Sequence, residues 1–208
     1  MQRLLSEIGR SQRLAVVNLL KRSMGLTVRE MAEKLQMSYM GVKTICLGLE
    51  KDGYVKTTRR NHGVGRPELL HLLTPKAQDL FPKQDNELAI TLLQQARKLY
   101  GTSAAEKLLF LYYQQKTAEY TDQIEADASP ERAVALARLR EKEGYMAECQ
   151  RGPQLCIIER HHPLQSLQES FPEMLGLERD MFQKILGAPV RTEHRNAGGN
   201  RETVFFVD

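Results

Sequence analysis

The stretch that decides the fold is TVREMAEKLQMSYMGVKTICLGLEKDG, residues 27–53, which has the pattern of two short helices joined by a tight turn. Thr27 and Glu30 have the spacing of a capping box, in which each side chain accepts a hydrogen bond from the other residue's backbone N–H. Ser38 is the candidate N-cap of the second helix, and Asp52-Gly53 ends it. Apolar residues recur at i, i+3, i+4 and i+7 in both segments: Val28, Met31, Ala32 and Leu35, then Val42, Ile45, Cys46 and Leu49. We therefore predict a helix-turn-helix.

The residues on either side extend this pattern to a winged helix-turn-helix. An apolar stripe within residues 10–23 predicts a preceding helix, and residues 54–57 are rich in strand-forming types. Residues 58–67 are a basic loop with two glycines, and residues 68–74 are typical of the returning strand. The two strands and their loop are thus predicted to form a β-hairpin wing, and the composition changes after residue 84.

The rest of the chain is predicted to be helical and then a small α+β region. Helices are expected at 86–100, 103–126, 129 to about 148, 164–170 and 174–186, and strands at 155–158, 190–194 and 203–207. The last two strands pair across a turn at 196–200. The expected fold class is mainly α with small β: a winged helix-turn-helix at 1–84, a helical region at 85–148 and an α+β domain at 149–208.

Charge is distributed unevenly along the 208 residues. Residues 1–84 hold 15 Lys and Arg against 7 Asp and Glu, a net charge of +8, whereas residues 85–208 have a net charge of −4. This asymmetry is typical of a nucleic-acid-binding module joined to one that avoids nucleic acid. No apolar run approaches the roughly 18 residues of a membrane helix, and no secretory signal is recognised. Three cysteines without framework spacing favour free thiols, so we expect a cytoplasmic protein.

The helix that follows Ser38 carries the first group of candidate DNA-binding residues. If its apolar positions face the core, the residues that turn outward are Met40, Lys43, Thr44, Leu47 and Lys51. Recognition helices contact base edges mainly near their N-termini, where hydroxyl groups read either edge and lysine reaches guanine acceptors. We therefore predict base contacts from Ser38, Tyr39, Lys43 and Thr44.

The hairpin loop carries the second group. Arg59, Arg60, His62 and Arg66 lie at or near its tip, and the neighbouring sequence supplies no acidic partner for them. Phosphate groups or the minor groove are the natural partners of such a loop.

A family resemblance rests on these residues and on others further along. The residues that carry it are Thr27–Leu35, the segment 42–54, Gly65-Arg-Pro67, Glu143-Gly-Tyr-Met-Ala-Glu148, Ile158-Glu159, His162-Pro163 and Phe171-Pro172 with the closing hairpin. Together they resemble the SufR-type winged-helix regulators, repressors of iron–sulfur cluster assembly. The resemblance implies a dimeric repressor that binds DNA.

The chain departs from that family at the cysteines that hold the family's cluster. At the matching positions it has His162, Leu175 and approximately Thr203. Leucine cannot ligate iron, and such a cluster needs about four thiolates. We therefore expect no iron–sulfur cluster and no other cofactor.

Two further sites stay open at this point. A different metal site would use Cys149, Cys156, His161, His162 and His194, although their spacing matches no zinc-finger motif. A ligand pocket would be lined by Tyr112, Tyr113, Tyr145 and Phe171, although aromatic residues at helical spacing are more often core.

The function expected from the sequence is a homodimeric DNA-binding transcription regulator, a repressor that binds a pseudo-palindromic operator. Residues 85–148 would hold the dimer, and residues 149–208 would sense an unidentified small-molecule or redox effector. The alternatives are a winged-helix protein-interaction module without DNA binding, and a metal or redox sensor that uses Cys156 and nearby histidines. An enzyme is not expected, because no phosphate loop, nucleophile elbow or carboxylate pair is found.

Overall fold

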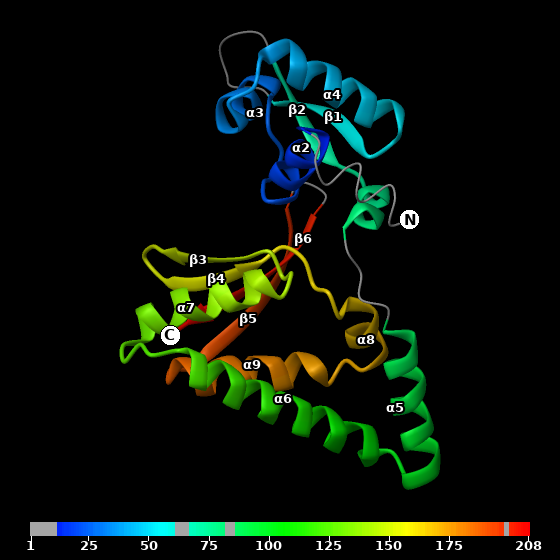
Figure 1. The fold of residues 1–208 in the computed structure, drawn as a ribbon, viewed down its shortest axis with the longest axis vertical. Coiled ribbons are helices and arrows are strands. Elements are labelled where there is room, and N and C mark those ends of the chain that lie inside the picture. Colours follow the sequence, from blue (N-terminus) through cyan, green and yellow to red (C-terminus); the bar gives the residue numbers. More distant parts are fainter. Residues whose placement is uncertain (1–11, 61–66, 82–85, 198–199) are drawn as a thin grey trace. The chain divides into compact units, whose positions relative to one another are not determined.

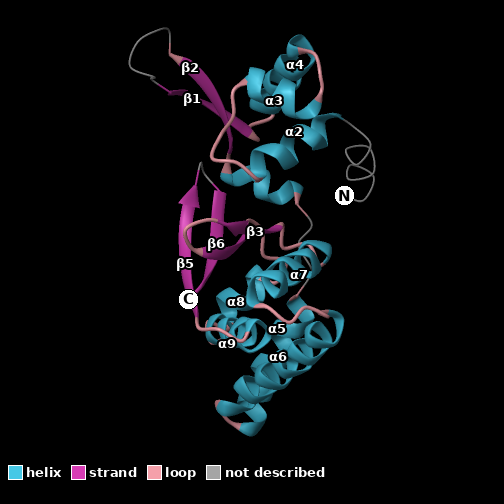
Figure 2. Ribbon diagram, turned by 90° about the vertical axis from the view of Figure 1, so that its left-hand side faces the viewer, coloured by secondary structure: helices cyan, strands magenta, loops and turns pink. Residues whose placement is uncertain are grey.

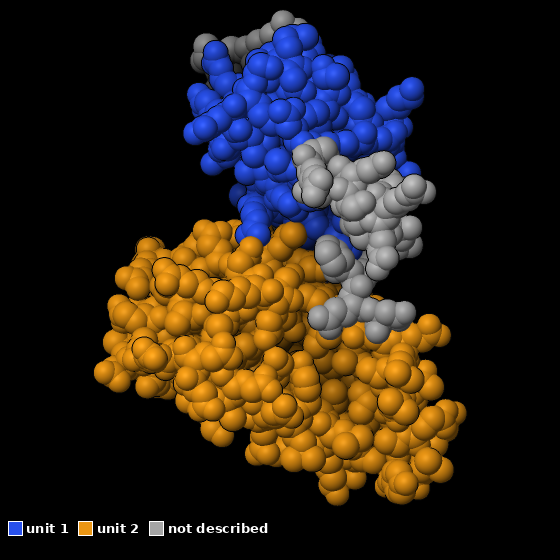
Figure 3. All heavy atoms as spheres, viewed as in Figure 1, with its two compact units in different colours: residues 1–82, 196–201 blue, residues 83–195, 202–208 orange. Residues whose placement is uncertain are grey.

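The computed structural model describes residues 12–60, 67–81, 86–197 and 200–208, and shows a mixed α/β protein with two small antiparallel sheets (Figures 1 and 2). The chain divides into two compact units (Figure 3). Unit 1 consists of residues 1–82 and 196–201, and unit 2 of residues 83–195 and 202–208. Residues 85–148 and most of 149–208, which the sequence analysis separates, therefore share one compact unit.

Unit 1 contains the helices and the hairpin predicted around residues 27–53. Its elements are α2 (Gln12–Lys21), α3 (Val28–Leu35), α4 (Tyr39–Lys51), β1 (Val55–Arg60), β2 (Glu68–Leu73) and the 3-10 helix η1 (Pro75–Leu80). The predicted capping box is confirmed: Glu30 N donates to Thr27 Oγ1 at 3.2 Å, and Thr27 N donates to Glu30 Oε2 at 2.6 Å. The predicted cap of α4 is also confirmed, since Gly41 N donates to Ser38 Oγ at 3.1 Å. These caps set where both helices begin.

The hairpin is antiparallel, with Val55 opposite Leu73 and Arg60 opposite Glu68. A contact that the sequence analysis did not predict adds Leu26 to the sheet: Leu26 N donates to His71 O at 3.1 Å, and His71 N donates to Leu26 O at 2.8 Å. The segment before α3 is therefore tied to the middle of β2. Helices α2, α3 and α4 bury their apolar faces in a shared core with the base of the hairpin: Val16, Val17, Leu20, Met31, Val42, Cys46, Leu49, Val55 and Leu73.

Unit 2 packs helices against a four-stranded sheet. Its elements are α5 (Glu87–Tyr100), α6 (Ser103–Gln123), α7 (Ser129–Lys142), β3 (Ala147–Arg151), β4 (Leu155–Glu159), α8 (Gln165–Ser170), α9 (Met174–Leu186), and β5 (Val190–Ala197) and β6 (Asn200–Val207) except for their ends within residues 196–201, which belong to unit 1. The strand order is β3-β4-β6-β5. The predicted strand at 155–158, the helix closed by Gly187 and the final pair of strands are confirmed.

One predicted helix boundary is wrong. The sequence pattern extends the helix from residue 129 to about Glu148, but α7 ends at Lys142 and residues 147–151 form β3. Gly144 lies in the left-handed region at φ 93°, and Tyr145 N donates back to Arg140 O at 3.1 Å. The chain therefore leaves the helix at this glycine, whose conformation suits a residue without a Cβ atom.

The aromatic residues proposed to line a pocket do not do so together. Tyr113, Tyr145 and Phe171 are buried within the core of unit 2, and Tyr112 is exposed. The three buried aromatic side chains are therefore core residues, and the four do not line a pocket together.

None of the helices in the described residues combines the length and apolar character that a membrane span requires. Cys46, Cys149 and Cys156 are free thiols, as predicted.

Candidate functional site

Helix α4 has a buried face and an exposed face, and both agree with the prediction. Val42, Cys46 and Leu49 are at most 1% exposed. The opposite face presents Lys43, Thr44 and Lys51 together with three large apolar side chains, Tyr39, Met40 and Leu47, which are 53%, 63% and 56% exposed. The exposed face therefore combines cationic, hydroxyl and apolar groups, the three types that read base edges in DNA-binding helices.

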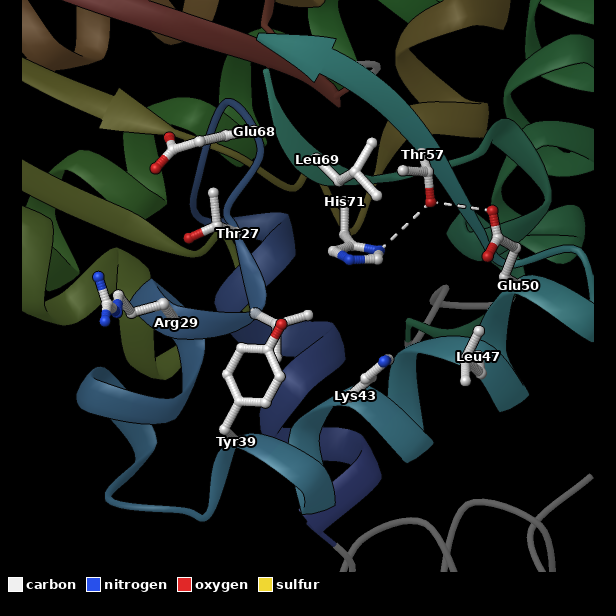
Figure 4. Close-up of a pocket in the computed structure, with 11 residues that line it drawn as sticks. Thr27, Arg29, Tyr39, Lys43, Leu47, Glu50, Thr57, Glu68, Leu69 and His71 are labelled. Atoms are coloured by element: carbon white, nitrogen blue, oxygen red, sulfur yellow. Dashed lines mark hydrogen bonds between the residues drawn. The ribbon is translucent and has the colours of Figure 1, made fainter. Parts of the chain in front are cut away.

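An open cleft of about 710 Å³ lies beside this face of α4 (Figure 4). Tyr39, Lys43 and Leu47 line one side, and Leu69 of β2 lies on the hairpin side. The residues that complete the lining are Thr27, Val28, Arg29, Glu50, Thr57, Glu68 and His71. The strand residues of this lining were not predicted, although the two-residue period of a strand places Leu69 and His71 on one face.

A hydrogen-bonded chain joins α4 to both strands at the edge of this cleft. Thr57 Oγ1 donates to Glu50 Oε1 at 2.9 Å and lies 3.4 Å from His71 Nδ1 (Figure 4). His71 is buried, and this burial lowers its pKa, against the opposing charge of Glu50. Burial therefore favours the neutral imidazole, and the hydrogen bonds join the hairpin to α4.

Arg60 has a different environment from the one expected. The prediction that it lacks an acidic partner is wrong, because its guanidinium lies 3.2 Å from Glu30 Oε1 and 3.0 Å from Glu68 Oε2. Hydrogen bonds to Glu68 and Glu30 raise the pKa of Arg60. Arg60 therefore ties the hairpin to the first turn of α3, and its DNA contact stays a prediction.

Of the other predicted cations of the hairpin, only Arg59 lies within the described residues. Arg59 is exposed at the end of β1, whereas His62 and Arg66 lie outside the described residues. Several further cations of unit 1 are exposed, and the described part of the chain gives them no ion pair: Arg29, Lys34, Lys43, Lys51 and Lys56. Exposed cations without acidic partners are available to an external polyanion.

The residues of the alternative metal site are not brought together. Cys156 packs with Ile158 and Val204 in a small cluster on the sheet, while His162 lies beside Glu178. His194 Nδ1 lies 3.1 Å from Thr203 Oγ1. Within the described ranges, no group of three or more His, Cys, Asp or Glu side chains has the arrangement of a metal site.

Unit 2 contains a buried charge cluster that the sequence analysis did not anticipate. Arg140 of α7 donates from Nε to Glu159 Oε1 at 2.6 Å and from Nη2 to Glu178 Oε1 at 2.5 Å. All three side chains are about 2–3% exposed. His162 Nε2 is 3.5 Å from Glu178 Oε2, and the guanidinium carbon of Arg140 is 3.2 Å from the Tyr145 ring centre. The cluster joins α7, β4 and α9 inside the unit. Its residues therefore hold these three elements together and are not exposed to a ligand.

Comparisons of the chain with protein-family models, with curated proteins and with solved structures give no match.

Proposed function

We propose that unit 1 is a winged helix-turn-helix that binds double-stranded DNA, with α4 in the major groove and the β1–β2 hairpin as the wing. The observation that carries this proposal is the exposed face of α4, where Lys43 stands among apolar and hydroxyl side chains at an open cleft. Three exposed cations that form no ion pair with a described residue, Lys43 and Lys51 of α4 and Arg29 at the cleft, are available to a phosphate backbone. A DNA ligand thus accounts for both the polar and the charged parts of the surface.

The test is fluorescence-anisotropy binding of the full chain to a pool of duplex DNA across a salt series. Steep salt dependence is expected, and Lys43→Ala should weaken binding and reduce the salt slope by about one. Lys142→Ala is the matched control, because Lys142 is exposed at the end of α7 in unit 2, outside the α5 and α6 surface. Binding that is absent or insensitive to salt would instead support a winged-helix protein-interaction module without DNA.

Homodimerisation is part of this proposal, and a feature of unit 2 favours it. The large exposed apolar side chains of the described part of unit 2 all belong to α5 and α6: Leu88, Leu92, Leu99, Tyr100, Leu108, Phe110, Leu111 and Tyr112. Helix α5 has no fully buried residue among its 14 positions. Apolar groups concentrated in this way are typical of interaction surfaces. A second copy would place two α4 helices on the two halves of a pseudo-palindrome.

Sedimentation velocity of the wild type and of the double variant Leu92→Glu, Leu111→Glu tests the dimer. We expect a dimer that becomes a monomer in the variant, while Met24→Glu, an exposed apolar position of unit 1, leaves it intact. A monomeric wild type would contradict this part of the proposal. If the wild type is a dimer, we propose that the protein acts as a cytoplasmic repressor with the architecture of the SufR type. Its effector would act through residues 149–208.

A further inference from the structure

The exposed apolar side chains of unit 1 gather at the proposed DNA-binding face. Five large apolar residues of the described part of unit 1 are exposed: Met24, Tyr39, Met40, Leu47 and Leu69. Four of them lie on α4 or in the cleft beside it. A surface that bound phosphate alone would need only cations and hydrogen-bond donors. A concentration of exposed apolar groups at this position is typical of an interaction surface that makes apolar contacts.

The geometry of α4 arranges part of this set as a stripe. Met40, Thr44 and Leu47 have the spacing i, i+4 and i+7, so they share one outward face of the helix. Thr44 Oγ1 donates to Met40 O at 2.9 Å, which uses its hydroxyl hydrogen within the helix. Thr44 therefore adds a methyl group to the apolar stripe and offers no hydroxyl hydrogen to a base acceptor.

The cations beside the apolar stripe of α4 favour DNA over a protein as the partner that covers it. Lys43 lies between Tyr39 and Leu47 on the side of α4 that lines the cleft, and Arg29 contributes a second cation there (Figure 4). A protein partner that covered the stripe would also desolvate Lys43 at a cost. In the major groove, by contrast, the lysine reaches guanine O6 and N7 or a phosphate, and the apolar group that the groove offers is the C5-methyl of thymine.

We propose that Met40, Thr44 and Leu47 read thymine methyl groups, so that the operator half-site contains thymines under α4 in addition to the base that Lys43 contacts. This inference rests on the proposed DNA binding. Met40 and Leu47 are seven residues apart, a rise of about 10.5 Å along the helix. Because this separation exceeds the roughly 3.4 Å repeat of base pairs along the duplex, the two side chains contact methyl groups of different base pairs.

The experiment begins with selection of binding sites from a random duplex library by the full chain. Each thymine of the selected site is then replaced singly by deoxyuridine, which lacks only the C5-methyl group, and binding is measured by anisotropy. We expect two or three positions at which the replacement weakens binding about fourfold, the effect of one buried methyl group. Leu47→Ala should remove this sensitivity at one position and Met40→Ala at a different position of the same half-site.

Met24→Ala is the matched control, because Met24 is an exposed methionine outside α4, and it should keep the full deoxyuridine sensitivity. Sequence-selective, salt-dependent binding that no deoxyuridine replacement changes would overturn the thymine inference and leave the proposed function standing. The thymine inference is also overturned if Leu47→Ala weakens binding to thymine and deoxyuridine sites equally. Absence of salt-dependent duplex binding would instead remove the proposed function itself.

Discussion

Helix α4 of unit 1 and the charge cluster of unit 2 place their charged side chains in opposite environments. On α4, Lys43 is exposed and forms no ion pair with any described residue. In unit 2, Arg140 is buried and is hydrogen-bonded to Glu159 and Glu178, which come from two other elements. A buried charge must be matched inside the fold, because transfer from water costs several kcal/mol per ion. Arg140 therefore supports the fold, whereas the charge of Lys43 stays in solvent, as the proposed DNA contact requires.

The largest effect is expected for Arg140→Met, which breaks the buried cluster. The substitution keeps an apolar stem but leaves the carboxylates of Glu159 and Glu178 without their cation. Removing one partner of a buried ion pair typically costs about 3–5 kcal/mol. Hydrogen exchange measured segment by segment should show the loss in α7, β4 and α9. Arg179→Met is the control, because the pair of Arg179 with Asp180 is exposed and contributes little. Unchanged protection of α9 would refute the structural importance of the cluster.

A smaller effect is expected from acid. Burial alone would raise the pKa of Glu178, but the charge of Arg140 and the hydrogen bond from His162 lower it to about 2. This folded-state pKa lies below the unfolded value of about 4.5, so the stabilisation is present above pH 4.5 and is lost as the pH falls towards 2. The neighbouring Glu159 acts in the opposite direction, since burial raises its pKa.

Thermal unfolding of the wild type and of Glu178→Gln between about pH 2 and pH 7 measures this contribution. The glutamine variant is expected to be the less stable protein at neutral pH, and the difference should shrink as the pH falls below about 4.5. A difference that stayed constant over the whole range would show that the charge of Glu178 does not stabilise the fold.

Thr27→Ala tests the local signal that starts α3, and its expected cost is about 1 kcal/mol. The substitution removes the acceptor of the Glu30 N–H, one half of the capping box. Thr27→Ser retains the hydroxyl and should restore most of the stability, while Thr58→Ala changes an exposed threonine of β1 as a control. Urea unfolding and hydrogen exchange of residues 28–35 would measure the change. Equal stability of the alanine and serine variants would exclude a capping role for the hydroxyl.

The separation of interacting residues along the chain explains how much of the structure could be predicted from the sequence. The caps at Thr27 and Ser38 and the two faces of α4 depend on residues within one or two turns of each other, so their spacing is visible in the chain. The partners of Arg60 lie 30 and 8 residues away, and those of Arg140 lie 19 and 38 residues away. Such pairs form only when tertiary packing brings the elements together, and no local pattern identifies them. Strand β3 escapes prediction for a similar reason, since its partner β4 supplies the pairing.

The smallest effect on stability is expected for Lys43→Ala. This small effect would distinguish the exposed charge of Lys43 from the buried charge of Arg140. An exposed side chain without a partner should change the free energy of unfolding by less than about 0.5 kcal/mol, because no described contact is lost. Urea unfolding would measure this value on the same preparation that is used for DNA binding. If Lys43→Ala weakens binding while stability is unchanged, the exposed charge acts on the ligand and not through the fold. A loss of stability comparable to that of Thr27→Ala would show instead that Lys43 belongs to the scaffold of unit 1, and the contrast with Arg140 would no longer hold.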